Sequence, residues 1–217
     1  MKGETILSIL KILSKKYPSH SKTTLNRMRD KPDPYKVLIS CLLSLRARDE
    51  NTEKVSKQLF AVATTPKQIA NMSTPKLEKL IFSSGHYKKK ARALKSVSQE
   101  LIKRFNSQVP QTRDELLSIK HIGPKTANIV LAFAYGQTVI PVDTHCHRIP
   151  NRLGWVKTKT AEKTEIELMK IIPKKYWNEF NAVFVQFGRD LCQPVSPWCS
   201  KCPIEKFCPK IGVKRSR

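Results

Sequence analysis

Four cysteines, Cys192, Cys199, Cys202 and Cys208, lie close together near the C-terminal end in the pattern C-x6-C-x2-C-x5-C. Four thiolates at this density can form a closed cage, which suits an iron–sulfur cluster or a structural zinc. Zinc sites more often use two C-x2-C pairs set a dozen or more residues apart. Disulfides are disfavoured, because we see nothing like a secretory signal at the N-terminal end and cytosolic thiols stay reduced. The spacing leaves zinc and iron–sulfur as open alternatives.

The charge of the chain limits what it can bind. Its 217 residues include 41 Lys and Arg against 17 Asp and Glu, a formal net charge of +24. A hydrophobic core cannot hold this excess, so it must lie on the surface, with local clusters such as Lys88–Lys90. A polyanion is the expected partner, and nucleic acid is favoured over an anionic membrane surface. No run approaches the roughly 18 apolar residues of a spanning helix, so we expect an intracellular protein, cytoplasmic or DNA-associated.

The hydrophobic pattern is helical almost throughout, which predicts an all-α fold of many short helices. Thr65-Pro66 and Thr74-Pro75 each read as an N-cap followed by proline at the first helical position, and Gly85 is expected to end the second of these helices. Other helices are expected over 5–13, 34–43, 87–105, 113–119 (capped by Thr112), 124–135, 160–171 and 175–187. One more is expected to carry Val55 and Leu59 after a cap at Asp49 or Asn51, and another to begin after Asp143. Residues 137–142 alone have strand-like composition, and they are too short and isolated to build a sheet.

The segment 121–128 predicts a helix, a tight hairpin and a second helix. We expect Gly123 to give the turn its conformational freedom and Pro124 to start the second helix. The backbone N–H groups at that helix start point outward with the positive end of the helix dipole, which is a geometry that binds phosphate. Such a hairpin holds a backbone phosphate and reads no base sequence.

Lys125 and Asp143 are the candidate catalytic pair. Lys125 sits at the helix start, where the dipole and neighbouring cations disfavour the ammonium, so a neutral amine could attack an electrophilic carbon and form a Schiff base. A solvated, phosphate-binding lysine is the competing interpretation. Asp143 is expected to cap a helix, and its carboxylate could also move protons or stabilise a developing cation.

Taken together, these segments resemble the endonuclease III family of DNA glycosylases and abasic-site lyases, within the helix–hairpin–helix superfamily. The resemblance is carried, in the family's order, by 42–49 (LLSLRARD), 85–91 (GHYKKKA), 122–128 (IGPKTAN), 142–145 (VDTH) and the four cysteines. It implies a two-lobed fold: a six-helix barrel over 25–135 that ends in the hairpin, and a second lobe of 1–24 and 136–217 with a [4Fe-4S] loop over 192–208.

The same resemblance implies the activity and the site. A monomer would bind double-stranded DNA, flip a damaged pyrimidine out of the duplex, and use Lys125 as nucleophile at the sugar C1′ with Asp143 as the essential carboxylate. The resulting imine would lead to β-elimination and a nick at the abasic site. Arg46 and the turn at His86 would fill the space left by the flipped base. The implied phosphate contacts are the hairpin residues His121, Ile122, Gly123, Pro124 and Thr126.

Three positions depart from the family's usual pattern. His121 stands where a glycine is usual, and histidine adopts positive φ less easily. Arg46 stands where many members have glutamine. The loop 193–198 has no basic residue, which argues against a DNA contact by that loop.

Two alternative functions remain. A monofunctional mismatch glycosylase would share much of the pattern, but such relatives generally lack lysine at the position of Lys125. A non-catalytic, redox-sensing DNA-binding protein would explain the charge, the hairpin and the cysteines, but it would not need both Lys125 and Asp143.

Overall fold

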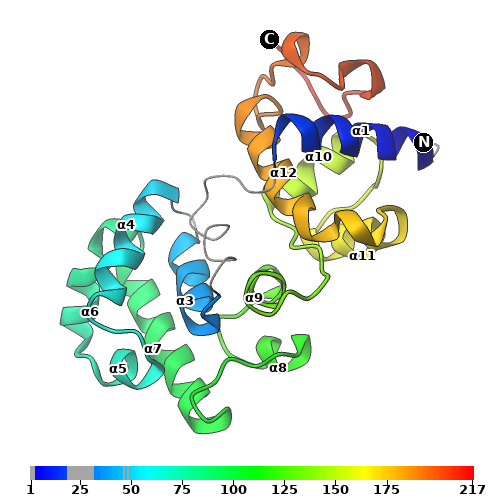
Figure 1. Cartoon of the computed structure of the whole chain (residues 1–217). Coiled ribbons are helices and arrows are strands. Elements are labelled where there is room, and N and C mark those ends of the chain that lie inside the picture. Colours follow the sequence, from blue (N-terminus) through cyan, green and yellow to red (C-terminus); the bar gives the residue numbers. More distant parts are fainter. Residues whose placement is uncertain (1–2, 19–31, 46, 48) are drawn as a thin grey trace. The chain divides into compact units, whose positions relative to one another are not determined.

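The computed structural model describes residues 3–18, 32–45, 47 and 49–217, apart from the side chain at 49. The described chain is helical and contains no strand, residues 137–142 included, which confirms the predicted all-α class. It divides into two compact units (Figure 1). We call the helices from α3 to α9 the central unit, and α1 together with the chain from Thr138 to Arg217 the terminal unit.

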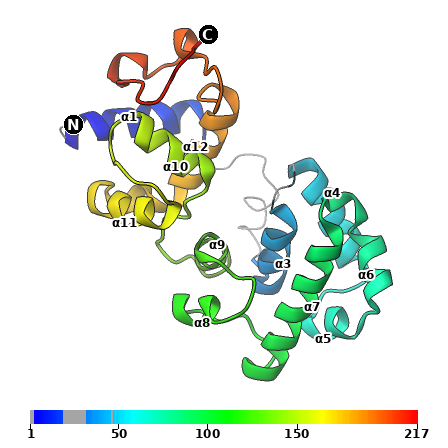
Figure 2. The same ribbon diagram turned by 180° about the vertical axis from the view of Figure 1, so that it is seen from behind.

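The central unit is built around two nearly all-apolar helices that pack against each other, α3 (Pro34–Ser44) and α9 (Pro124–Tyr135). Its other elements are α4 (Asp49–Phe60), α5 (Pro66–Asn71), α6 (Thr74–Leu80), the 3₁₀ turn η1 (Phe82–Ser84), α7 (Tyr87–Arg104) and α8 (Arg113–Leu117). The amphipathic α7 packs on α5, α6 and α3 through its apolar stripe, and Figure 2 shows it from behind.

The terminal unit packs α10 (Thr144–Arg152) against α12 (Trp177–Asp190) and α11 (Ala161–Ile171), and α1 (Gly3–Lys16) against α12. Its core includes the stacked rings of Phe180 and Phe184, with centroids 4.0 Å apart. The turns η2 (Lys174–Tyr176), η3 (Cys199–Lys201) and η4 (Glu205–Phe207) complete the unit. The last two shape the cysteine segment.

The predicted helices are present, and several of their ends differ from the predicted ones by one to three residues or more. Thr65 caps α5 in a capping box with Gln68, and Gly136 ends α9 with φ of 65°. The N-cap of α6, however, is Ser73 rather than Thr74, and Gly85 follows η1 rather than α6, which already ends at Leu80. Prolines tolerate the first or second helical position equally, so the Thr-Pro pattern alone does not fix the cap.

No helix in the described ranges is long and apolar enough to cross a membrane.

Candidate functional site

The predicted hairpin is present in the central unit between α8 and α9. Ile122 is 5% exposed, and its N–H donates to the Ile119 carbonyl at 3.1 Å. The residue that needs positive φ is His121, at 74°, whereas Gly123 is extended (φ −96°, ψ 174°). The expectation that Gly123 supplies the turn's freedom is therefore wrong, because the left-handed position lies two residues earlier, where histidine can occupy it.

The start of α9 has the features of an anion-binding helix end. Gly123 is its N-cap, and no side chain of the described residues caps it. The N–H groups of the first turn have no partner within the helix, and Pro124 contributes none. A Cβ built at Gly123 would meet nothing within 4 Å, so the surface there is open to a ligand.

Lys125 follows directly in the first turn of α9 and is half-buried. Burial raises the pKa of the Cys41 thiol in α3. The charge of Lys125 and a hydrogen bond with Thr126 act on the same thiol in the opposite direction. Cys41 is 1% exposed and is a small apolar residue of the core. The packing of α9 on α3 thus fixes the backbone from which Lys125 extends.

A basic hollow of about 580 Å³ lies beside the hairpin in the central unit. It is formed by α3, α7 and the hairpin, and its lining residues are Leu42, Leu45, Lys89, Lys90, Arg92, Ala93, Ser96, Lys120 and His121. Lys89 and Lys120 are exposed, but Lys90 is buried, so the cluster Lys88–Lys90 does not face solvent as a whole.

The turn before α7 holds two consecutive residues at positive φ, Gly85 at 65° and His86 at 48°. His86 is exposed, and its side chain does not cap α7. A left-handed non-glycine residue is uncommon and often marks a functional segment. The other expected gap-filling residue, Arg46, lies outside the described residues.

Sequence reasoning missed Phe82 beside this turn. Its side chain is 65% exposed, and its ring lies 4.8 Å from that of Tyr87 between centroids. An apolar run predicts burial for such a residue, so only the structure shows an exposed phenylalanine beside the half-buried Tyr87, next to His86.

In the terminal unit, Asp143 is the N-cap of α10, as predicted. Its Oδ1 accepts from the backbone N–H groups of His145 and Cys146, both at 2.9 Å. Two N–H donors on one oxygen hold the carboxylate in a fixed orientation.

The same helix fastens the cysteine segment through two arginines, one turn apart. Arg148 Nη2 donates to the Cys192 carbonyl at 2.7 Å and to His145 Nδ1 at 3.1 Å. Arg152 is 8% exposed; its guanidinium donates to Cys192 Sγ at 3.4 Å and to the carbonyls of Gln193 and Pro194 at 2.6 Å each. Neither arginine was predicted to have a role, although their i, i+4 spacing places them on one helix face.

Gly188 of α12 lies against side chains of α10. A Cβ at this position would lie 2.2 Å from His145 Nδ1 and 3.1 Å from Arg148 Nη2. We therefore expect Gly188→Ala to destabilise the protein by about 1–3 kcal/mol, as overpacking of a filled core does. Denaturant unfolding of the variant measures this. Gly3→Ala is the control, because a Cβ there meets nothing within 4 Å. Equal unfolding free energies for the two variants would contradict the close packing.

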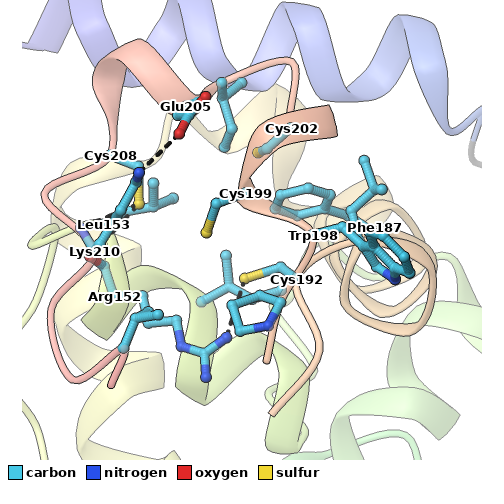
Figure 3. Close-up of a pocket in the computed structure, with 15 residues that line it drawn as sticks. Arg152, Leu153, Phe187, Cys192, Trp198, Cys199, Cys202, Glu205, Cys208 and Lys210 are labelled. Atoms are coloured by element: carbon cyan, nitrogen blue, oxygen red, sulfur yellow. Dashed lines mark hydrogen bonds and ion pairs between the residues drawn. The ribbon is translucent and has the colours of Figure 1, made fainter. Parts of the chain in front are cut away.

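The four clustered cysteines line one pocket of the terminal unit, drawn in Figure 3. All four are half-buried free thiols, and the cavity that they line is small, with a volume of about 30 Å³. A second hydrogen bond to a sulfur comes from the Lys210 backbone N–H, which donates to Cys208 Sγ at 3.4 Å.

Burial raises the pKa of Cys202 to about 11 and also raises that of Cys208, and repulsion from the other thiolates adds to both. Cys202 and Cys208 thus lie in a poorly solvated part of the pocket. No group of three or more His, Cys, Asp or Glu side chains is gathered closely enough for a single metal ion in the described part of the chain.

The chain is similar to a family model and to curated proteins. Residues 39–174 match the family model described as HhH-GPD superfamily base excision DNA repair protein. Endonuclease III of Thermotoga maritima is 44% identical over 194 residues, which cover 89% of this chain and 87% of the relative. Endonuclease III of a Synechocystis species is 32% identical over 209 residues, 96% of this chain and 93% of the relative.

Solved structures extend the likeness. A trapped endonuclease III–DNA covalent intermediate superposes with a TM-score of 0.88 at 34% identity, over 97% of each chain. A non-covalent endonuclease III–DNA complex gives a TM-score of 0.87 at 34% identity, over 97% of this chain and 96% of that one. The chain belongs to the endonuclease III family of the HhH-GPD superfamily.

Proposed function

We propose that this protein is a bifunctional DNA glycosylase and abasic-site lyase of base excision repair that acts on damaged pyrimidines. The observation that carries the proposal is a lysine, Lys125, in the first turn of a helix whose open N-terminal end suits a phosphate. Its relatives include an endonuclease III captured as a covalent DNA intermediate, and a covalent step requires such a nucleophile.

The residues have separate parts in the reaction. The Lys125 amine bonds to C1′ of the flipped nucleotide while the damaged base leaves with the electrons of the glycosidic bond. Loss of the amine proton and ring opening give an imine. Removal of a C2′ proton then expels the 3′ phosphate and nicks the strand, and water releases Lys125. The fixed carboxylate of Asp143 stabilises the positive charge that grows on the sugar.

Activity on defined duplexes tests the proposal. One duplex carries a single oxidised pyrimidine and a second carries a pre-made abasic site. We expect nicked product from both without added alkali. Product that appears from the first duplex only after alkali would indicate a monofunctional glycosylase. Binding without any product would indicate a DNA-binding protein instead.

The hairpin and the basic hollow are proposed to hold DNA phosphates. Each phosphate neutralised adds about −0.9 to the slope of log K against log salt. We expect Lys120→Ala to make the slope shallower by about 0.9, measured by titration of undamaged duplex at several salt concentrations. Lys57→Ala is the control, because Lys57 pairs with Glu53 at 3.0 Å on α4. An unchanged slope in Lys120→Ala would remove Lys120 from the interface.

We infer that Cys192, Cys199, Cys202 and Cys208 hold a [4Fe-4S] cluster. The fit rests on four thiols around one apolar pocket, with N–H donors from Arg152 and Lys210 directed at two sulfurs. Such donors are typical around cluster sulfurs, and binding to iron would remove the repulsion among the thiolates. The cluster would cross-link a segment whose other structure is two short 3₁₀ turns, η3 and η4.

The purified protein should be yellow-brown, with about four irons and four inorganic sulfides per chain. Colorimetric iron and sulfide assays measure this. Cys202→Ala should lower the cluster content and destabilise the protein, because it removes one ligand of the cross-link. The matched control is Cys41→Ala, which removes a thiol from the central unit and should leave the iron content unchanged. Stoichiometric zinc without sulfide would overturn the assignment.

A further inference from the structure

A buried lysine in α7 connects two segments of the central unit. Lys90 is 8% exposed, and its ammonium donates to the Leu43 carbonyl at 2.7 Å and to the Ser84 carbonyl at 2.6 Å. Leu43 lies in the last turn of α3, and Ser84 ends the 3₁₀ turn η1. Carbonyls at helix ends have no partner within their helix, so one side chain satisfies both ends at once.

The position of this charge is unusual. Burying an ammonium is unfavourable, and desolvation lowers the pKa of Lys90 to about 8. A hydrophobic side chain of similar size would avoid that cost but could not bond to the two carbonyls. Charge-assisted hydrogen bonds of this length are among the stronger and more directional contacts in proteins. The two hydrogen bonds of Lys90 therefore fix the position of the Ser84 carbonyl relative to the Leu43 carbonyl, which a space-filling apolar side chain could not do.

The segments that Lys90 joins adjoin both residues proposed to fill the gap in DNA. Ser84 is followed by Gly85 and His86, and Leu43 precedes Arg46 by three residues in the sequence. A second donor supports the same turn from α4, where the Asn51 amide bonds to the Ser83 carbonyl. Side chains from two helices thus hold the final carbonyls of η1, directly before the left-handed pair at 85–86.

We propose that Lys90 is a positioning residue for base extrusion: it ties the turn before α7 to the end of α3 and so sets where His86 projects. Lys90 is 8% exposed and its ammonium is taken up by two backbone carbonyls, so it acts through the turn. The inference rests on the proposed wedge role of His86, which is to fill the space that the flipped base leaves in the duplex.

The test compares two rates for each variant, base excision from a duplex with one damaged pyrimidine and incision of a pre-made abasic site. Extrusion of a paired base costs more than extrusion of an abasic sugar. We expect Lys90→Met to lower the ratio of excision to incision about tenfold, the scale expected when a charge-assisted hydrogen bond is lost. Lys103→Met is the matched control. It removes the same charge from an exposed position of α7 that does not line the basic hollow, and it should leave the ratio unchanged.

A double-mutant cycle separates positioning from general damage. If Lys90 acts through the turn, Lys90→Met should change the ratio little once His86 is already glycine. Independent, additive effects of His86→Gly and Lys90→Met on the ratio would overturn the inference. Because Lys90→Met leaves two buried carbonyls unbonded, it could fold poorly. Lys90→Gln, which keeps N–H donors, and Asn51→Ala, which loosens the same turn, should then lower the ratio in the same direction.

The outcomes distinguish this inference from the function on which it rests. Equal losses on both substrates in His86→Gly would reject the wedge role itself. A selective loss in His86→Gly, combined with equal losses in the Lys90 and Asn51 variants, would reject only the positioning role of Lys90.

Discussion

Borohydride should trap no protein–DNA adduct when Lys125 is replaced by glutamine. Trapping reduces the imine between the lysine and C1′, and an amide nitrogen cannot form that imine because its lone pair is delocalised. The unmodified protein should give an adduct on abasic duplex, and its crosslinked peptide should contain Lys125. Binding by Lys125→Gln should stay within about tenfold, since one lost surface charge is worth about 1 kcal/mol.

Lys120→Gln is the matched control for this experiment. Lys120 is an exposed lysine in the same hairpin, five positions earlier, and it lines the basic hollow. Its substitution should weaken binding slightly and leave trapping intact. A crosslink at another lysine, or undiminished trapping in Lys125→Gln, would show that the nucleophile is assigned wrongly.

Replacing Asp143 by asparagine should reduce single-turnover base excision by about 10²-fold or more, the usual scale for a catalytic acid–base group. The two side chains are nearly isosteric, and asparagine is also a good N-cap. The amide oxygen can therefore still accept from the N–H groups of His145 and Cys146, and the fold should persist. What disappears is the negative charge that would stabilise the developing cation on the sugar.

Asp33→Asn provides the control for Asp143→Asn. Asp33 caps α3 in the same way, with its Oδ1 accepting from the N–H groups of Tyr35 and Lys36 at 3.0 and 3.1 Å. Its substitution should leave excision nearly unchanged, and thermal unfolding should shift little in both variants. If Asp143→Asn retained full excision, the carboxylate would have only the structural role of a helix cap.

The reaction requires Lys125 and Asp143 to meet, although 18 positions separate them in the sequence. Lys125 belongs to the central unit and Asp143 to the terminal unit. Their convergence stays a prediction, and loss of excision in both single variants, with DNA binding retained, would support it.

Features that depend on a few neighbouring residues could be predicted from the sequence. The capping residues Thr65, Thr112 and Asp143 are where they were predicted, because a cap depends on the next two or three residues only. The hairpin before Pro124 and the grouping of the four cysteines followed for the same reason: each is encoded within a short stretch of chain.

The tertiary structure decided the contacts between residues far apart in sequence. Lys90 reads as part of a basic surface cluster, yet it is buried because α3 and η1 present two carbonyls to it. Arg152 reads as one more basic residue, yet it is directed at Cys192, 40 positions away. Gly188 carries no turn signal, and only the approach of α10 requires it. Periodicity and propensity describe one element at a time, so they determined the helices, whereas packing between helices selected the partners of each side chain.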